Sequence, residues 1–320
     1  MRRRIYSEFV APDILRSAGL LRALASRSIQ LVVAVTPDSA ATCPGVIGAC
    51  REHGVEVAIW PMLEPADGRW ANAENADRFS SFAVELASDL ETEDALPDEV
   101  VIDLEPPYWF KERPLRGLVK AQKLNVGSAT DRFRMLLAEL AALGLTVSAV
   151  VAPTVAMGPQ HVGRGWQHLI GTPVSGLPFD HVSIMVYTSL IEGYSRGWLG
   201  RADTTALLWQ SARAVRKACG DRAGISLGCI GTGVFGDEGT YRGPAQLAED
   251  VAIARAAGVT DLALFNLGGA LARPPLDAWL DPMVDDRPLA AVPTNTLRAA
   301  SVWRLASLAG HVGSWLHRNR

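Results

Sequence analysis

Residues 98–105 read Asp98-Glu99-Val100-Val101-Ile102-Asp103-Leu104-Glu105, and Pro106-Pro107 follows at once. This mostly apolar run predicts a β-strand over 100–105, because proline has no backbone N–H for a strand ladder and so ends the strand. Alternate side chains of a strand point to opposite faces, and one face here is wholly aliphatic. Such a strand is typical of a parallel sheet that helices cover.

Asp103 and Glu105 share the other face of this strand. At about 3.3 Å per residue their Cα atoms are about 6.6 Å apart, and both lie at the C-terminal end of the strand. A buried carboxylate is costly unless it is paired or serves chemistry. Two of them on an otherwise apolar strand predict an acid/base pair, so we expect Asp103 and Glu105 to be catalytic.

The rest of the chain alternates short aliphatic runs with helix-length segments. Further strands are predicted at 5–10, 30–36, 55–62, 146–152, 181–188, 224–232 and 261–266. Helices are predicted between them at 12–26, 73–90, 129–143, 204–218 and 244–257, and Gly54, Gly144 and Gly258 suit left-handed helix ends. Eight βα repeats favour an α/β fold, a (β/α)8 TIM barrel with an extra C-terminal helix. An open doubly wound sheet is the alternative, but no G-x-G-x-x-G follows the first strand. We expect the barrel over residues 1–285, and a linker with an amphipathic helix over 286–320.

Composition narrows the classes of partner. Apolar residues make up 48% of the 320 residues and charged residues 20%, which indicates a globular protein with a large core. The net charge of -3 argues against nucleic acid as a partner. The cysteines at 43, 50, 219 and 229 form no C-x-x-C pair, which favours reduced core thiols over zinc ligands or disulfides. We expect no metal and no cofactor.

The N-terminal residues and the hydropathy of the chain bear on its location. Basic residues at positions 2–4 precede no long apolar stretch, so we expect no signal peptide. The sequence also has no run of about 18 apolar residues that would span a membrane. A cytoplasmic protein is therefore expected.

Other strand ends supply candidate substrate-binding residues, because the C-terminal ends of barrel strands form the catalytic mouth. Alternation on the third strand turns Trp60 and Glu64 towards the interior or the mouth, where a tryptophan could stack on a sugar ring. A tryptophan that only fills the core is the other reading. The first strand places Glu8 inward in the same way. On the sixth strand Met185 and Tyr187 point inward, and the Tyr187 hydroxyl could donate a hydrogen bond into the mouth.

Two long irregular stretches follow the fourth and fifth strands. Residues 106–128 carry Tyr108, Trp109 and Phe110, and residues 153–180 are rich in glycine and proline. Long connections with aromatic side chains are expected to form walls or lids of a ligand groove. Trp109 is therefore a candidate substrate-binding residue.

The fourth and sixth strands together resemble glycoside hydrolase family 18, the chitinase-like barrels. That family carries D-G-x-D-x-D-x-E on its fourth strand, and Asp98, Asp103 and Glu105 match the first, third and final acids. Met185-Val186-Tyr187 matches the M-x-Y of its sixth strand. The resemblance implies a glycan that contains N-acetylhexosamine as the substrate, with Glu105 as the proton donor to the glycosidic oxygen. It also implies that Asp103 orients the substrate N-acetyl group, which attacks the anomeric carbon, and that Tyr187 binds the acetamido oxygen.

The chain departs from this family pattern at several positions. Glu99 and Val101 replace the glycine and the middle aspartate of the fourth strand, and Thr188 stands where an acid or amide is usual. Asn266 lies near the position of the expected tryptophan at the end of the eighth strand, and we take it as a candidate substrate-binding residue. These departures leave open a glycan-binding lectin or scaffold without turnover. An isomerase or lyase acting on another small molecule is a further alternative, since this fold hosts many chemistries.

Other site chemistries are consistent with the same residues. Glu8 or Glu64 could supply a second carboxylate opposite Glu105, which would give a conventional retaining or inverting glycosidase. A Mg²⁺ site made of Glu64, Asp103 and Glu105 is less favoured. The run 231–233, Gly-Thr-Gly, either cradles a phosphate after the seventh strand or simply forms a tight turn.

The C-terminal segment predicts an amphipathic helix that begins after a cap within 294–296. Apolar residues recur at helical spacing at Leu297, Leu305, Leu308, Val312, Trp315 and Leu316, and arginines occur at 298, 304, 318 and 320. Such a basic helix with a tryptophan could rest on a membrane surface or contact another subunit. The alternative is a helix packed against the barrel.

Overall fold

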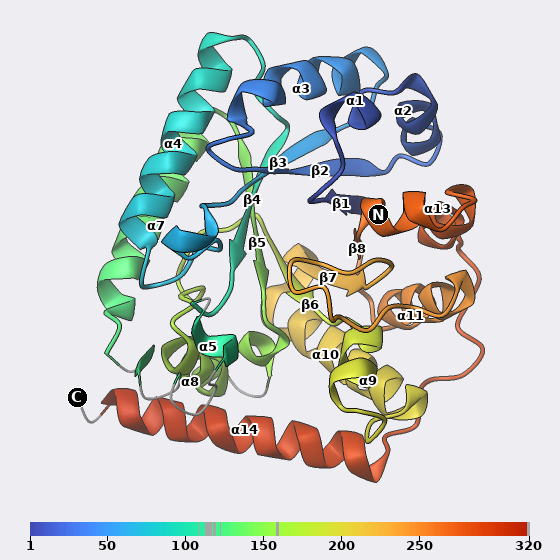
Figure 1. The fold of residues 1–320 in the computed structure, drawn as a ribbon. Helices are drawn as coiled ribbons and strands as arrows, with labels where there is room; N and C mark the ends of the chain where they lie inside the picture. The colour runs from blue at the N-terminus through green and yellow to red at the C-terminus, as the bar shows by residue number, and fades with distance from the viewer. Residues whose placement is uncertain (108, 113–116, 118–119, 122, 158–159, 319–320) are drawn as a thin grey trace. The chain divides into compact units, whose positions relative to one another are not determined.

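The computed structural model describes residues 1–107, 109–112, 117, 120–121, 123–157 and 160–318. Its strands are hydrogen-bonded in sequence order, β1 to β8, as a closed barrel, and helices alternate with them (Figure 1). The strands are β1 Arg2–Ser7, β2 Gln30–Val35, β3 Val57–Pro61, β4 Glu99–Leu104, β5 Thr146–Val151, β6 His181–Met185, β7 Ala223–Gly228 and β8 Asp261–Phe265. The predicted TIM barrel with an extra C-terminal helix is confirmed.

The helices cover the strands in the order that the βα rhythm predicts. They are α1 Pro12–Leu15, α2 Ala18–Ala25, α3 Cys43–Glu52, α4 Ala76–Thr92, α5 Trp109–Glu112, α7 Val126–Ala142, α8 Gln160–Ile170, α9 Thr188–Tyr194, α10 Arg201–Cys219, α11 Pro244–Ala256, α12 Leu267–Ala272, α13 Asp277–Val284 and α14 Leu297–Arg318. Gly54, Gly144 and Gly258 have positive φ angles after α3, α7 and α11, as predicted. Helices α5 and α8 lie in the two stretches expected to be irregular, so that expectation was wrong there. Tyr108 lies outside the described residues.

Most predicted strands run too far at their C-terminal ends. β1 ends at Ser7, so the predicted strand end at residue 10 was wrong, and the alternation that turned Glu8 inward does not reach it. Glu8 is half-buried after this strand, and its place in the site stays a prediction. β4 ends at Leu104 and β6 at Met185, which leaves Glu105 and Tyr187 in the connections that follow. The hydrophobic pattern continues past the last ladder hydrogen bond, and strand ends are poorly marked in sequence for this reason.

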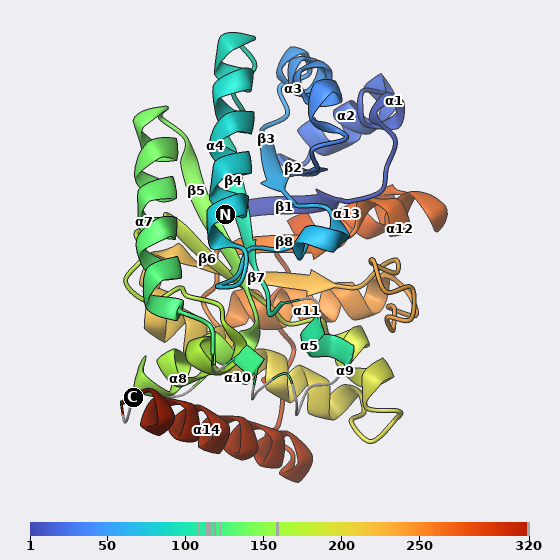
Figure 2. The same cartoon turned by 60° about the vertical axis from the view of Figure 1, so that its left-hand side comes forward.

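By its internal contacts the chain forms two compact units. Unit 1 comprises Met1–Val33, Ala49–Val57 and Ser183–Leu305, and unit 2 comprises Ala34–Gly48, Ala58–Val182 and Ala306–Arg320. In unit 2, β4 and β5 pair in parallel with Asp103 opposite Val150. Helices α4 and α7 lie side by side, where Phe79 and Phe133 make an edge-to-face contact with ring centroids 6.3 Å apart (Figure 2).

Unit 1 contains β1, β7 and β8 and a buried ion pair at the N-terminal ends of two of these strands. Arg4 of β1 and Asp261 of β8 are buried, and Arg4 Nε donates to Asp261 Oδ1 at 3.0 Å. Neighbouring serines also face each other, since the hydroxyls of Ser183 and Ser226 are 2.9 Å apart. These four buried polar side chains are therefore paired, as burial favours.

A second buried network in unit 1 centres on Asp250 of α11. Its Oδ2 accepts hydrogen bonds from Thr188 Oγ1 at 2.5 Å and from the Tyr241 hydroxyl at 2.6 Å. Its Oδ1 accepts from Arg201 Nη2 at 2.6 Å, and Arg201 Nε donates to Glu249 at 2.8 Å. Burial raises the pKa of Asp250, while the charge of Arg201 and these hydrogen bonds oppose the rise. The network joins the first turns of α9 and α10 to α11.

The start of α14 is held by a side-chain cap within unit 1. The N–H of Ala299 donates to Thr296 Oγ1 at 3.0 Å, and Thr296 Oγ1 donates to Asp203 Oδ1 at 2.6 Å. This hydrogen bond lowers the pKa of Asp203, and burial opposes the change. The predicted cap within 294–296 is confirmed.

The part of α14 in unit 2 docks on α8 through backbone contact. A Cβ added at Gly313 would lie 2.4 Å from the carbonyl oxygen of Gly165, and one added at Gly165 would lie 1.9 Å from that of Gly310. The indole of Trp166 donates to the carbonyl of Ala306 at 2.8 Å. The alternative of a helix packed against the barrel is therefore confirmed at α8, and small residues make this contact. Among the described residues no helix is both long and apolar enough to cross a membrane.

Candidate functional site

The two acids of β4 lie where the strand ends, and both have backbone hydrogen bonds to one neighbouring segment. The N–H of Ala71 donates to the carbonyl of Asp103 at 2.9 Å, and the N–H of Glu105 donates to the carbonyl of Ala71 at 3.2 Å. Ala71 thereby forms a parallel bridge with Leu104. The Asp103 residue is only 3% exposed, whereas Glu105 is half-buried. The predicted pair thus has one sealed and one accessible carboxylate.

The segment beside these acids is fixed by asparagine side chains. Asn72 is buried, its Nδ2 donates to the carbonyl of Trp70 at 2.9 Å, and its Oδ1 accepts from the N–H of Glu74 at 2.9 Å. Asn75 adds a second hydrogen bond to the same Trp70 carbonyl at 2.9 Å. This connection between β3 and α4 is therefore an ordered wall next to the acid pair.

The other candidates in unit 2 differ in exposure. Trp60 is buried within β3, which favours core packing over an open sugar platform, and Glu64 is half-buried after that strand. The indole of Trp109 on α5 donates to Glu74 Oε2 at 2.6 Å. Lys120 lies over the Trp109 ring with its Nζ 3.9 Å from the centroid, and this Nζ is 3.3 Å from Glu74. A cation over the ring covers one aromatic face of Trp109.

The candidates of β6 and β8 lie together in unit 1. The Tyr187 ring stacks on Phe265, with centroids 5.7 Å apart and planes 23° apart, and Met185 is half-buried at the end of β6. Asn266 is the N-cap of α12: its Oδ1 accepts from the N–H of Gly269 at 2.7 Å and its Nδ2 donates to the carbonyl of Thr232 at 3.3 Å. The structure therefore gives Asn266 a structural role at the end of β8.

Sequence reasoning missed a carboxylate next to this aromatic pair. Glu238 lies in the connection after β7 and is 8% exposed, and its Oε1 accepts from the N–H of Phe235 at 3.1 Å. Its buried Oε2 has no hydrogen-bond partner among the described residues. A Cβ at Gly233 would lie 3.0 Å from Glu238 Oε1 and 3.3 Å from the Phe265 ring. Burial, and then the charge of Glu238, raises the pKa of the Cys229 thiol.

A signal for Glu238 was present in the sequence. Asp237-Glu238 follows the seventh strand within a glycine-rich run, which places an acid pair in a connection after the C-terminal end of a strand. The hydroxyl of Tyr194 donates to Asp237 at 3.0 Å. Burial, together with this hydrogen bond, raises the pKa of Tyr194.

The glycines after β7 are explained by packing. A Cβ at Gly231 would lie 2.7 Å from the Cα of Gly269, and one at Gly269 would lie 2.1 Å from the N of Gly231. Two backbones thus approach each other at a distance that only glycine allows. Of the two readings of 231–233, the structure favours the tight turn over a phosphate cradle.

The remaining acids and thiols of the sequence motifs have ordinary surroundings. Asp98 is exposed before β4, and Glu99 is buried and accepts a hydrogen bond from Ser148 Oγ. Cys43, Cys50 and Cys229 are buried, as predicted for core thiols, whereas Cys219 is half-buried. Among the residues that the structure describes, no group of three or more His, Cys, Asp or Glu side chains could hold a metal ion.

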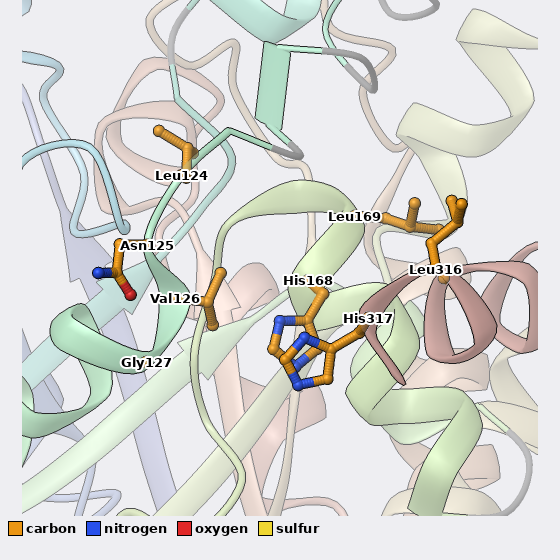
Figure 3. Close-up of a pocket in the computed structure, with 9 residues that line it drawn as sticks. Leu124, Asn125, Val126, Gly127, His168, Leu169, Leu316 and His317 are labelled. Atoms are coloured by element: carbon orange, nitrogen blue, oxygen red, sulfur yellow. The ribbon is translucent and has the colours of Figure 1, made fainter. Parts of the chain in front are cut away.

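A cavity of about 250 Å³ lies in unit 2 where α8 and α14 meet the start of α7. His168 and His317 stack against each other at its edge, with ring centroids 3.4 Å apart and planes 17° apart (Figure 3). The other lining residues are Leu124, Asn125, Val126, Gly127, Leu169, Gly313 and Leu316. The edge of this cavity thus carries two stacked imidazoles, which would repel each other if both were protonated.

Replacement of His168 by glutamine is expected to reduce the acid sensitivity of the fold. Burial, and then the nearby His317, lowers the pKa of His168 from 6.5 to about 4. Between these two pH values the unfolded chain binds a proton that the folded chain does not, so stability is complete above pH 6.5 and falls as the pH falls towards 4. Because His168 is partly exposed, we expect the loss between about pH 7 and pH 5 to be only about 1 kcal/mol.

Urea unfolding at about pH 7 and at about pH 5 measures this loss of stability. His311→Gln is the matched control, since His311 is exposed on α14, the helix that also carries His317. The wild type and the control should lose stability in parallel, and His168→Gln should lose less. An unchanged pH dependence in His168→Gln would contradict the assignment.

The fold is shared with solved carbohydrate-active proteins. The chain is similar to the PgaB (BpsB) glycoside hydrolase domain from Bordetella bronchiseptica, with a TM-score of 0.57, 11% sequence identity, and coverage of 90% of this chain and 100% of that one. It is also similar to ZgEngAGH5_4, solved in complex with a cellotriose, with a TM-score of 0.54, 14% identity, and coverage of 89% and 96%. No protein-family model matches the sequence, and no curated protein matches it either. At these identities the similarity shows the TIM-barrel fold.

Proposed function

We propose that this protein hydrolyses glycosidic bonds in a glycan that contains N-acetylhexosamine, with Glu105 as the general acid. The observation that carries the proposal is the acid pair at the end of β4, with Asp103 buried and Glu105 half-buried beside it. A sealed carboxylate next to an accessible one suits a site in which the first stabilises charge and the second exchanges protons. The similarity of the fold to glycoside hydrolase domains supports the same class of reaction.

The reaction proceeds in two steps. Glu105 donates its proton to the glycosidic oxygen while the substrate acetamido oxygen attacks the anomeric carbon and the leaving group departs. Asp103 orients the acetamido group and stabilises the positive charge that develops on it. Water then attacks the anomeric carbon, the bond from the acetamido oxygen to that carbon breaks, and the Glu105 carboxylate takes the water proton. Tyr187 binds the acetamido oxygen, and Trp109 and Glu64 contact the sugar rings.

Glu238 favours a second mechanism of the same class. Its buried Oε2 has no hydrogen-bond partner among the described residues, and the Tyr187–Phe265 pair lies next to it through Phe265. A buried carboxylate oxygen without a partner is costly, and a substrate hydroxyl would satisfy it. In this mechanism Glu238 rather than the substrate acetamido group attacks the anomeric carbon.

The two mechanisms make different demands on the substrate. Aryl glycosides of N-acetylglucosamine and of glucose should be assayed with the wild type, together with Glu238→Ala in the presence and absence of azide. Hydrolysis confined to the N-acetyl substrate, with activity retained in Glu238→Ala, supports acetamido attack. Hydrolysis of both substrates, with azide restoring the turnover that Glu238→Ala has lost, supports Glu238 as the nucleophile.

Binding without turnover is the competing function. Calorimetric titration with N-acetylglucosamine oligomers measures it directly, in the same preparation used for the assays. Tight binding of these oligomers, with no hydrolysis of any substrate over long incubation, would replace the hydrolase proposal with a glycan-binding protein.

A further inference from the structure

Helix α14 carries large apolar side chains on an exposed face. Leu297, Leu305, Leu308, Val312 and Trp315 are between 48% and 89% exposed. Because an α-helix turns about 100° per residue, these five positions fall within about 80° of arc along one side of the helix. We call this set the apolar stripe of α14.

The orientation of the stripe is fixed by the opposite side of the helix. In unit 1, Ala299 is buried against Leu199, Ala206 and Leu207. In unit 2, the backbones of Gly165 and Gly313 approach so closely that a Cβ on Gly313 would lie 2.4 Å from the Gly165 carbonyl oxygen. Only small residues fit these contacts, so the helix cannot roll over to bury its larger side chains. The stripe therefore faces solvent because of how the helix docks.

The charge of the helix has one sign. Residues 297–318 contain Arg298, Arg304 and Arg318 and no aspartate or glutamate. On the same angular projection Arg304 and Arg318 border one edge of the stripe, and Arg298 borders the other. Arg298 also donates to the carbonyl of Trp198 at 2.8 Å, and the Trp198 side chain is 51% exposed beside the start of α14.

We propose that α14 binds an anionic lipid surface, with the helix in the plane of the headgroups and the apolar stripe inserted between them. A basic helix with exposed leucine and tryptophan on one side matches both the charge and the apolar region of such a surface. A second copy of this chain fits less well: antiparallel pairing centred on Leu308 would place Arg298 of one helix beside Arg318 of the other. The helix has no carboxylate to neutralise that contact.

Sedimentation of the full chain with vesicles tests the proposal. One set of vesicles contains phosphatidylcholine alone, and the other contains phosphatidylcholine and phosphatidylserine in equal parts. The wild type should sediment with the phosphatidylserine vesicles and be released as salt is added. Leu308→Glu combined with Val312→Glu should weaken binding by at least about tenfold, because two inserted side chains become charged. Arg304→Gln should weaken it about fivefold.

Met135→Glu is the matched control, since Met135 is 56% exposed on α7, away from the stripe. It should bind the vesicles as the wild type does, and thermal unfolding should show that each variant is folded. Equal sedimentation with both vesicle types, or full binding by the double variant, would overturn the proposal. So would a dimer of the wild type that the double variant abolishes while no form of the protein binds vesicles. None of these readouts depends on turnover, so the outcome is independent of the glycosidase proposal.

Discussion

Replacement of Glu105 by glutamine is expected to lower glycoside turnover by a factor of about 10² to 10⁴, the contribution typical of a positioned general acid. Glutamine keeps the shape of the side chain but has no proton to give to the glycosidic oxygen. Substrate binding should change little, so the loss should appear in kcat rather than in KM. Hydrolysis of an aryl glycoside with a poor leaving group measures it, because such a substrate depends most on protonation of the leaving oxygen.

The design includes a control at the other end of β4 and an internal check. Asp98 lies before the N-terminal end of β4 and is exposed, so Asp98→Asn should leave turnover unchanged. An aryl glycoside with a very good leaving group should lose much less rate in Glu105→Gln than a poor one. Equal rates for wild type and Glu105→Gln on the poor leaving group would remove Glu105 as the acid.

Replacement of Asp250 by alanine is expected to destabilise the fold by about 3–5 kcal/mol. Asp250 is fully buried and accepts hydrogen bonds from Arg201, Thr188 and Tyr241. Its removal leaves the Arg201 charge without its buried partner and two hydroxyls without their acceptor, and each such group carries a desolvation cost. Urea unfolding at neutral pH measures the change in the free energy of unfolding.

Glu249→Ala is the matched control because Glu249 pairs with the same guanidinium from the surface. Its side chain is 48% exposed and lies 2.8 Å from Arg201 Nη2. An exposed ion pair contributes about 0–1 kcal/mol, so this variant should stay close to the wild type. A change below about 1 kcal/mol in Asp250→Ala would show that the network does not hold α9, α10 and α11 together.

Thr188 illustrates how a departure from a sequence motif can be structural. The resemblance to chitinase-like barrels places an acid or amide at this position, where it would face the substrate. In the structure Thr188 Oγ1 donates to the buried Asp250 carboxylate and accepts from Arg201 Nη1 at 3.0 Å. The hydroxyl therefore belongs to the network that anchors the start of α9, immediately after Tyr187.

The barrel could be predicted because the same strand-and-helix pattern recurs along the chain. Each strand is a short aliphatic run, and glycines such as Gly144 and Gly258 mark helix ends before the next strand. Errors gathered where a strand passes into a loop, as at Glu8, because side-chain alternation carries no mark of the last ladder hydrogen bond. The location of Asp103 and Glu105 at the end of the fourth strand could be predicted because the strand is mostly apolar and two prolines follow it.

Two features could not be predicted from local pattern. Glu238 lies in an irregular connection, so no periodicity indicates that it is buried against Gly233. The stripe of α14 was detected, but its direction was not, because the helix docks through Ala299, Gly310 and Gly313. A pattern of apolar residues predicts which side of a helix avoids water, and a docking contact between glycine backbones reverses that rule for this helix.

The bridge between Ala71 and Leu104 ties the β3–α4 connection to the end of β4. Ala71 bonds to the backbone on both sides of Leu104, at Asp103 and at Glu105. A β3–α4 connection taken from another barrel would therefore lack the Ala71 bridge, which holds the backbone of both acidic residues. Exchange of this connection should therefore disturb the backbone of both acids together.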